Sequence, residues 1–176
     1  MAKCFFPPES STDNMVFTKF DIGWFSIAVT YHNAFRDIFA PESHPESHGG
    51  TFRLFPAMLL FRHTMELLLK AILNDSCHAR PPTSEHNLDK LDVQVMQCLP
   101  NPWGDDMVFV REALSELQAV DPGTGFRYGT NKQNELHFKG QPKTVDATRL
   151  FGVCKKLWEV LMNAHGPVSF PEKRIV

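Results

Sequence analysis

No charge of one sign dominates this sequence. Its 176 residues include 18 lysines and arginines and 20 aspartates and glutamates, for a net charge of −2. A nearly neutral chain has no overall electrostatic attraction to nucleic acid or to an acidic membrane. Any contact with phosphate must therefore come from a local group of basic residues.

The sequence also lacks a long apolar run. The richest stretch, residues 54–73, is interrupted by Arg62, His63, Glu66 and Lys70. A membrane-spanning helix needs about 18 or more apolar residues, so we expect no membrane partner. Near the start of the chain, Phe5 and Phe6 are followed at once by two prolines, which is too short for the apolar centre of a signal peptide.

The four cysteines form no metal or redox motif. No two of them are spaced as C-x-x-C, and Cys77 beside His78 lacks the second ligand pair of a zinc site. Cys98 and Cys154 fall on apolar helical positions, where a free cysteine behaves as a small hydrophobic residue. We expect free thiols, no metal, no cofactor and a reducing, cytoplasmic location.

What the sequence has in quantity is phenylalanine, with 15 Phe against 2 Tyr and 3 Trp. Hydrophobic residues make up 43% of the chain and charged residues 22%, which is typical of a soluble globular protein. We expect one domain over 1–176, with a core from 14 to 165 and a tail from 166 to 176. Five phenylalanines crowd the first predicted helix on more than one face, and this surplus predicts a second buried surface that we assign to a dimer. They are Phe17, Phe20, Phe25, Phe35 and Phe39.

The 13 prolines divide the chain into windows in which apolar residues recur every three or four positions. This pattern predicts an all-α fold, an up-down bundle of four long helices and one short one. The expected helices cover 14–40, 52–74, 87–99, 106–120 and 144–165. Short strand-like pieces predict a small β-hairpin over 126–139.

The second helix carries a charged strip. Arg62 with Glu66, and Glu66 with Lys70, are pairs of opposite charge spaced four residues apart. The strip is either a ligand groove or an ion-paired helix edge. Because this helix is the most apolar one and therefore central, a buried strip would be a candidate site.

A second group of polar residues lies in the predicted hairpin. Arg127, Tyr128, Asn131 and His137 are joined there by two lysines, so the hairpin is a small basic region on a neutral protein. Such a region can bind a phosphate or a nucleotide. The alternative is a structural hairpin whose arginine pairs with Glu112 or Glu116 on a helix.

Taken together, three motifs resemble the HEPN family of helical domains over residues 15–165. The second helix reads FRHTMELLLKAIL, with Glu66, Lys70 and Ala71 at the family's positions, and HNLDKL follows with His86. An Arg-Tyr pair, Arg127 and Tyr128, precedes the last helix. The resemblance implies a helical bundle that often forms a homodimer, and a role in a toxin–antitoxin or phage-defence system.

The resemblance also suggests chemistry. Many members cleave RNA without a metal, using an arginine to hold phosphate and a histidine, four to six residues away, to move a proton. Here nine residues separate Arg127 from His137, while Arg80 and His86 have a family-like spacing in a different part of the chain.

We therefore carry three hypotheses. The leading one is a nucleotide- or RNA-associated accessory module. The second is an endoribonuclease with Arg127 and His137 as catalytic residues, and the third is a structural dimerisation domain. The expected ligand-binding residues are Tyr128, Asn131, Arg62, Glu66, Lys70 and His86.

Overall fold

A computed structural model describes residues 23–39, 50–79, 84–121 and 146–166. Within these ranges every long element is a helix and no strand is present, which confirms the predicted all-α bundle. The helices are α1 (Trp24–Phe39), α2 (Gly50–Ala71), α3 (Leu88–Cys98), α4 (Met107–Val120) and α5 (Ala147–His165). A π-helical turn, Ile72–Ser76, continues α2, and a 3₁₀ turn, Gly104–Asp106, precedes α4. The expected hairpin at 126–139 lies outside the described residues.

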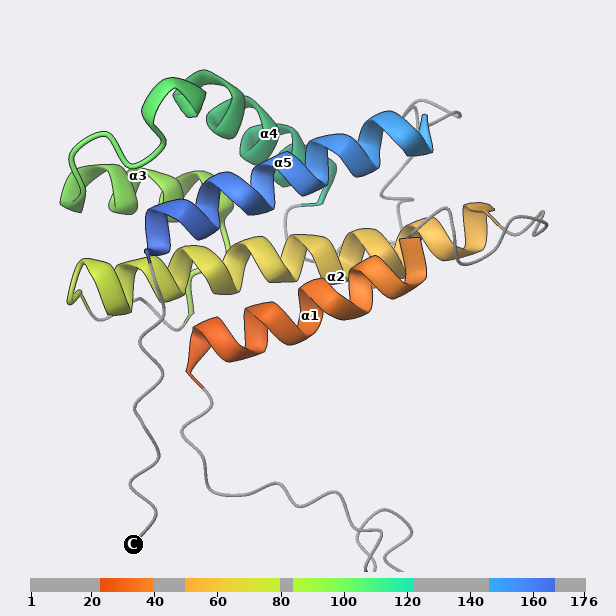
Figure 1. Ribbon diagram of the computed structural model, residues 1–176, viewed down its shortest axis with the longest axis horizontal. Helices are drawn as coiled ribbons and strands as arrows, with labels where there is room; N and C mark the ends of the chain where they lie inside the picture. Colours follow the sequence, from red (N-terminus) through yellow and green to blue (C-terminus); the bar gives the residue numbers. More distant parts are fainter. Residues whose placement is uncertain (1–22, 40–49, 80–83, 122–145, 167–176) are drawn as a thin grey trace, which may run out of the picture.

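Helix α2 is the centre of the bundle. It packs against α1, α3 and α5, and Figure 1 shows α1 on one side of it and α5 on the other. The apolar stripe predicted for this helix is its buried face: Met58, Phe61, Met65, Leu68 and Ile72 are all buried, and only Leu54 is partly exposed. Burial of this stripe is the main force that holds the bundle together.

Helices α2 and α3 run in the same direction. His86, just before α3, contacts Glu66 in the middle of α2, while Cys98, the last residue of α3, is bonded to Cys77 just beyond α2. The chain between the two helices therefore returns along α2 before α3 begins. The strict alternation of an up-down order is broken at this step, because that return allows α3 to run parallel to α2.

Aromatic rings fill the space between α1, α2 and α5. The ring of Phe35, which is almost fully buried, lies 5.0 Å from that of Phe61 and 6.2 Å from that of Phe151, measured between centroids. Phe25 stacks on His165 at 4.5 Å. The described phenylalanines of α1 thus pack within this chain, whereas Phe17 and Phe20 lie outside the described residues.

Side-chain caps mark the start of two helices. Asn87 caps α3 by accepting a hydrogen bond from the backbone N–H of Lys90 at 3.0 Å. Asp146 caps α5 by accepting one from the backbone N–H of Arg149 at 2.9 Å. Helix α2 was expected to begin at residue 52 but begins at Gly50, and Pro56 sits inside it, where it removes one backbone donor.

Two of the cysteines do not have the expected free thiols. Cys77 and Cys98 form a disulfide, with 5.8 Å between their Cα atoms, a usual separation for such a bond. The prediction failed because α3 runs parallel to α2 and the ends of the two helices lie together, which the spacing of cysteines in the sequence does not reveal. Cys154 is free and buried, and burial raises the pKa of its thiol to about 12. The cytoplasmic location remains a prediction.

None of the described helices has the length and apolar character needed to cross a membrane.

Candidate functional site

The charged strip of α2 is buried around one carboxylate. Glu66 Oε2 accepts a hydrogen bond from Arg62 Nη1 at 2.9 Å, and Oε1 accepts one from Lys70 Nζ at 2.9 Å. The helical spacing of four residues places all three side chains on one face. Each of the three residues is at least 97% buried, so the strip is an internal ion cluster.

Two other segments complete this cluster, which we call the Glu66 cluster. His86 Nδ1 lies 2.8 Å from Glu66 Oε1, and the His86 carbonyl accepts a hydrogen bond from Arg62 Nη2 at 2.6 Å. Arg62 Nε donates to the carbonyl of Asp121 at 3.0 Å, and the buried Asp121 carboxylate lies 3.8 Å from the same nitrogen. The cluster therefore joins α2 to the start of α3 and the end of α4.

The charges inside the Glu66 cluster compensate one another. Burial raises the pKa of Glu66, but hydrogen bonds from Lys70 and His86, the charge of Lys70 and the hydrogen bond from Arg62 together hold it below its usual value. Lys70 also lies 5.3 Å from the centre of the Trp24 ring. Because Arg62 and Lys70 are buried and engaged, neither offers a charge to a ligand from solvent.

His86 is the exception, because its side chain is 59% exposed. Its carbonyl is held by Arg62 and its ring nitrogen Nδ1 by Glu66, so the ring has a fixed position. The other ring nitrogen, Nε2, has no hydrogen bond to a described residue. With Nδ1–H donating to Glu66, Nε2 accepts a hydrogen bond when the ring is neutral and donates one when the ring is protonated.

The structure thus brings together four of the residues expected to bind a ligand, Arg62, Glu66, Lys70 and His86, although His86 is 20 residues from Glu66 in sequence. The other two, Tyr128 and Asn131, and the catalytic candidates Arg127 and His137 lie outside the described residues. Whether Arg127 and His137 meet stays a prediction.

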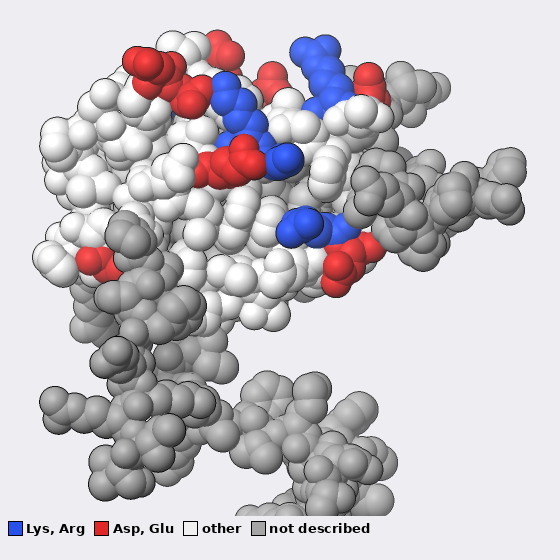
Figure 2. Space-filling view, in the orientation of Figure 1, with Lys and Arg blue, Asp and Glu red and all other residues white. Residues whose placement is uncertain are grey.

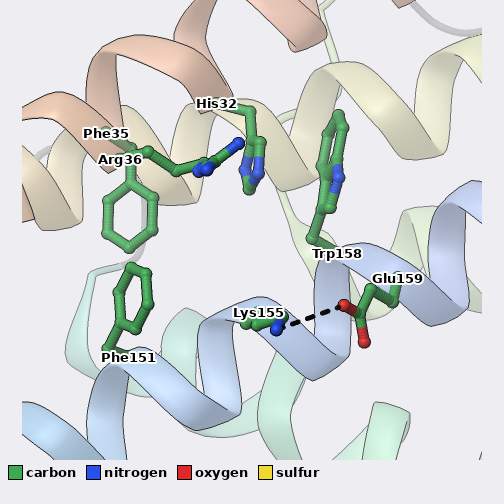
Figure 3. A pocket seen from close by; sticks show the side chains of 7 residues that line it. All are labelled: His32, Phe35, Arg36, Phe151, Lys155, Trp158 and Glu159. Atoms are coloured by element: carbon green, nitrogen blue, oxygen red, sulfur yellow. Dashed lines mark ion pairs between the residues drawn. The ribbon is translucent and has the colours of Figure 1, made fainter. Parts of the chain in front are cut away.

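A groove between α1 and α5 was not expected from the sequence. It has a volume of about 310 Å³ and is lined by His32, Phe35, Arg36, Phe151, Lys155, Trp158 and Glu159 (Figure 3). The first three come from two turns of α1 and the other four from α5, at spacings that put each set on one helix face. Arg36, Lys155 and Glu159 are exposed at the rim.

His32 is the buried polar group of the groove. Its ring stacks on Trp158 with 3.9 Å between ring centres and 5° between ring planes. Burial, and then the charge of Arg36, lower the pKa of His32 to about 4, so the ring is neutral at physiological pH. Its Nδ1 is buried and has no hydrogen-bond partner among the described residues. A buried unpaired nitrogen of this kind destabilises a fold by roughly 1–3 kcal/mol, which calls for an explanation.

Charges of both signs alternate on the face of the molecule seen in Figure 2. The basic and acidic side chains there are interspersed, without a broad area of one sign. No group of three or more His, Cys, Asp or Glu side chains within the described ranges is placed to hold a metal ion.

We expect Glu66→Gln to lower the free energy of unfolding by about 3–5 kcal/mol, because it leaves two buried cations without their shared carboxylate. Urea unfolding followed by circular dichroism measures this. Glu159→Gln is the control, because the exposed Glu159 carboxylate lies as far as 3.9 Å from Lys155. Loss of this weak surface pair should change the free energy of unfolding by less than about 0.5 kcal/mol. Equal losses in the free energy of unfolding for the two substitutions would contradict the assignment of Glu66 to an internal ion cluster.

Acid should destabilise the protein through His32. The ordinary pKa of 6.5 applies to the unfolded chain and the value of about 4 to the folded one, so the unfolded chain binds the proton first. The free energy of unfolding should therefore fall as the pH drops from 6.5 to about 4, by up to about 3 kcal/mol. Urea unfolding across this range should show a smaller fall for His32→Phe than for the original protein. If the free energy of unfolding fell equally with pH in both proteins, His32 would not be the group responsible.

Comparison with protein-family models, with curated proteins and with solved structures finds no match to this chain. The resemblance to HEPN domains therefore depends on the sequence motifs alone. Any function must be argued from the side chains described above.

Proposed function

We propose that this protein is a HEPN-like accessory module that associates with nucleotide or RNA, and that His86 contacts a phosphate. The proposal rests on the exposed imidazole of His86. Its ring is held by Glu66 and its backbone carbonyl by Arg62. Toxin–antitoxin or phage-defence systems are the context that the family resemblance suggests.

The geometry suits phosphate recognition. When the His86 ring carries two protons, Nδ1–H faces the Glu66 carboxylate and Nε2–H is a charge-assisted hydrogen-bond donor on the exposed side. Lys90 lies in the first turn of α3, four residues after His86, and is exposed. Its ammonium group lies 3.4 Å from Glu85, which offsets part of its charge, so His86 is the main contact of the proposal.

The near-zero net charge sets the expected strength of binding. With one or two phosphate contacts, the affinity for single-stranded RNA should fall with salt at a logarithmic slope of only about 0.7 to 1.4. A protein with a broad basic surface would show a much steeper dependence. The slope of affinity against salt concentration therefore measures how many phosphates the protein contacts.

We expect His86→Ala to weaken binding of a single-stranded RNA oligonucleotide by about fivefold to tenfold, because one charge-assisted contact is lost. Fluorescence anisotropy with a labelled oligonucleotide measures this. His78→Asn is the matched control, because His78 is exposed on the same connection and has φ of 51°, which asparagine tolerates.

Unchanged affinity in His86→Ala would overturn the assignment of the phosphate contact to this residue. Cleavage of the RNA that is lost in His137→Ala and in Arg127→Ala would instead favour the endoribonuclease hypothesis.

The proposal includes a homodimer, which the family resemblance also implies. Of the exposed large apolar side chains of the described residues, two lie near each other: Val93 on α3 is 45% exposed and Val108 on α4 is 68% exposed. Both line one groove between α3 and α4, which also carries charged side chains. We assign these two valines to the contact with the second copy.

At micromolar concentration, light scattering should give twice the chain mass of 20.0 kDa. Val108→Glu should shift the protein to the monomer by placing a charge in the interface, with an unchanged circular dichroism spectrum. A monomeric mass for the original chain would remove the dimer from the proposal.

A further inference from the structure

We propose that the groove between α1 and α5 binds a small planar aromatic monoanion that carries a hydrogen-bond donor on its ring. This site is separate from the Glu66 cluster and from His86. It goes beyond the proposed function, because it concerns a small molecule and uses none of the same side chains.

The walls of the groove define a slot for a ring. In Figure 3, Phe35 and Phe151 lie together on one side of the open space, and His32 and Trp158 stand side by side across it. Ring centroids are 6.2 Å apart in the first pair and 3.9 Å in the second, and the His32 and Phe35 rings are 6.1 Å apart, so the four rings form one continuous aromatic border of the open space. An aromatic border of this kind favours a flat aromatic ligand, and about 310 Å³ suits a small molecule.

The charged side chains at the rim of the groove determine which ligand charge it favours. Arg36 and Lys155 contribute two positive charges, and Glu159, which lies 3.9 Å from Lys155, contributes one negative charge. The lining therefore carries a net charge of +1, since His32 is neutral. One carboxylate on the ligand would neutralise it, placed between the guanidinium and the ammonium group.

The unpaired nitrogen of His32 favours a ligand whose ring carries an N–H group. A neutral imidazole has one nitrogen that accepts a hydrogen bond, and Nδ1 of this buried ring has no partner among the described residues. Nδ1 has almost no accessible surface in the unliganded protein, so a ligand N–H would satisfy it once the His32 ring turns toward the groove. This explains why a polar residue occupies a position in the aromatic cluster where phenylalanine would pack without an unsatisfied atom.

Indole-3-carboxylate combines a planar ring, one negative charge and one N–H, and serves as the probe. In calorimetric titration of the full chain, we expect it to bind about tenfold more tightly than the neutral indole-3-carboxamide. Arg36→Gln and Lys155→Gln should each weaken the carboxylate about fivefold and leave the carboxamide unchanged. Lys156→Gln is the matched control, because Lys156 is the next residue on α5 but pairs with Asp106 instead of lining the groove.

The role of His32 is tested first by changing the ligand and then by changing the residue. 1-Methylindole-3-carboxylate lacks the N–H and should bind about fivefold more weakly than indole-3-carboxylate. In His32→Phe this difference should disappear.

Equal affinity for the carboxylate and the carboxamide, or no binding at millimolar probe, would overturn the proposal. A loss in Lys156→Gln equal to that in Lys155→Gln would do so as well. His86→Ala should leave the probe affinity unchanged, so failure of this proposal and failure of the RNA proposal are distinguishable.

Discussion

The buried carboxylate of Glu66 is the interaction on which the arrangement of the helices depends. It accepts hydrogen bonds from Arg62 and Lys70 on its own helix and contacts His86 at the start of α3, while Arg62 reaches Asp121 at the end of α4. Such a cluster adds less stability than an apolar core of equal volume, but it permits few alternatives. Sliding of α3 along α2 would take the His86 carbonyl away from Arg62 and the His86 ring away from Glu66, so the cluster favours one register between these two helices.

The two candidate sites differ in how their polar groups are satisfied. In the Glu66 cluster every buried charge has a partner, and chemistry is available only at the exposed ring of His86. In the groove between α1 and α5 the opposite holds, since a buried imidazole nitrogen is unpaired and the rim charges reach solvent. The first arrangement favours a fixed contact with a large ligand, and the second favours enclosure of a small one.

Much of the fold follows from the sequence, because each helix carries its own apolar stripe and its own stop signals. The spacing of four residues also predicts that Arg62, Glu66 and Lys70 share a face. The partners contributed by His86 and Asp121 do not follow from local patterns, since they depend on the path of the chain back along α2. The disulfide between Cys77 and Cys98 escapes prediction for the same reason. The groove was missed because His32 and Trp158 fall among apolar positions that read as core.

Shared use of one carboxylate also has a consequence for evolution. Substitution of Glu66 alone removes the partner of the buried Arg62 and Lys70, and substitution of either cation alone removes one hydrogen bond to the carboxylate. We therefore expect these three positions, and His86 in the loop, to be substituted together during evolution. A basic, acidic and basic residue at successive steps of four, followed by a histidine 20 positions after the acid, is thus a fingerprint for distant relatives whose remaining sequence has diverged.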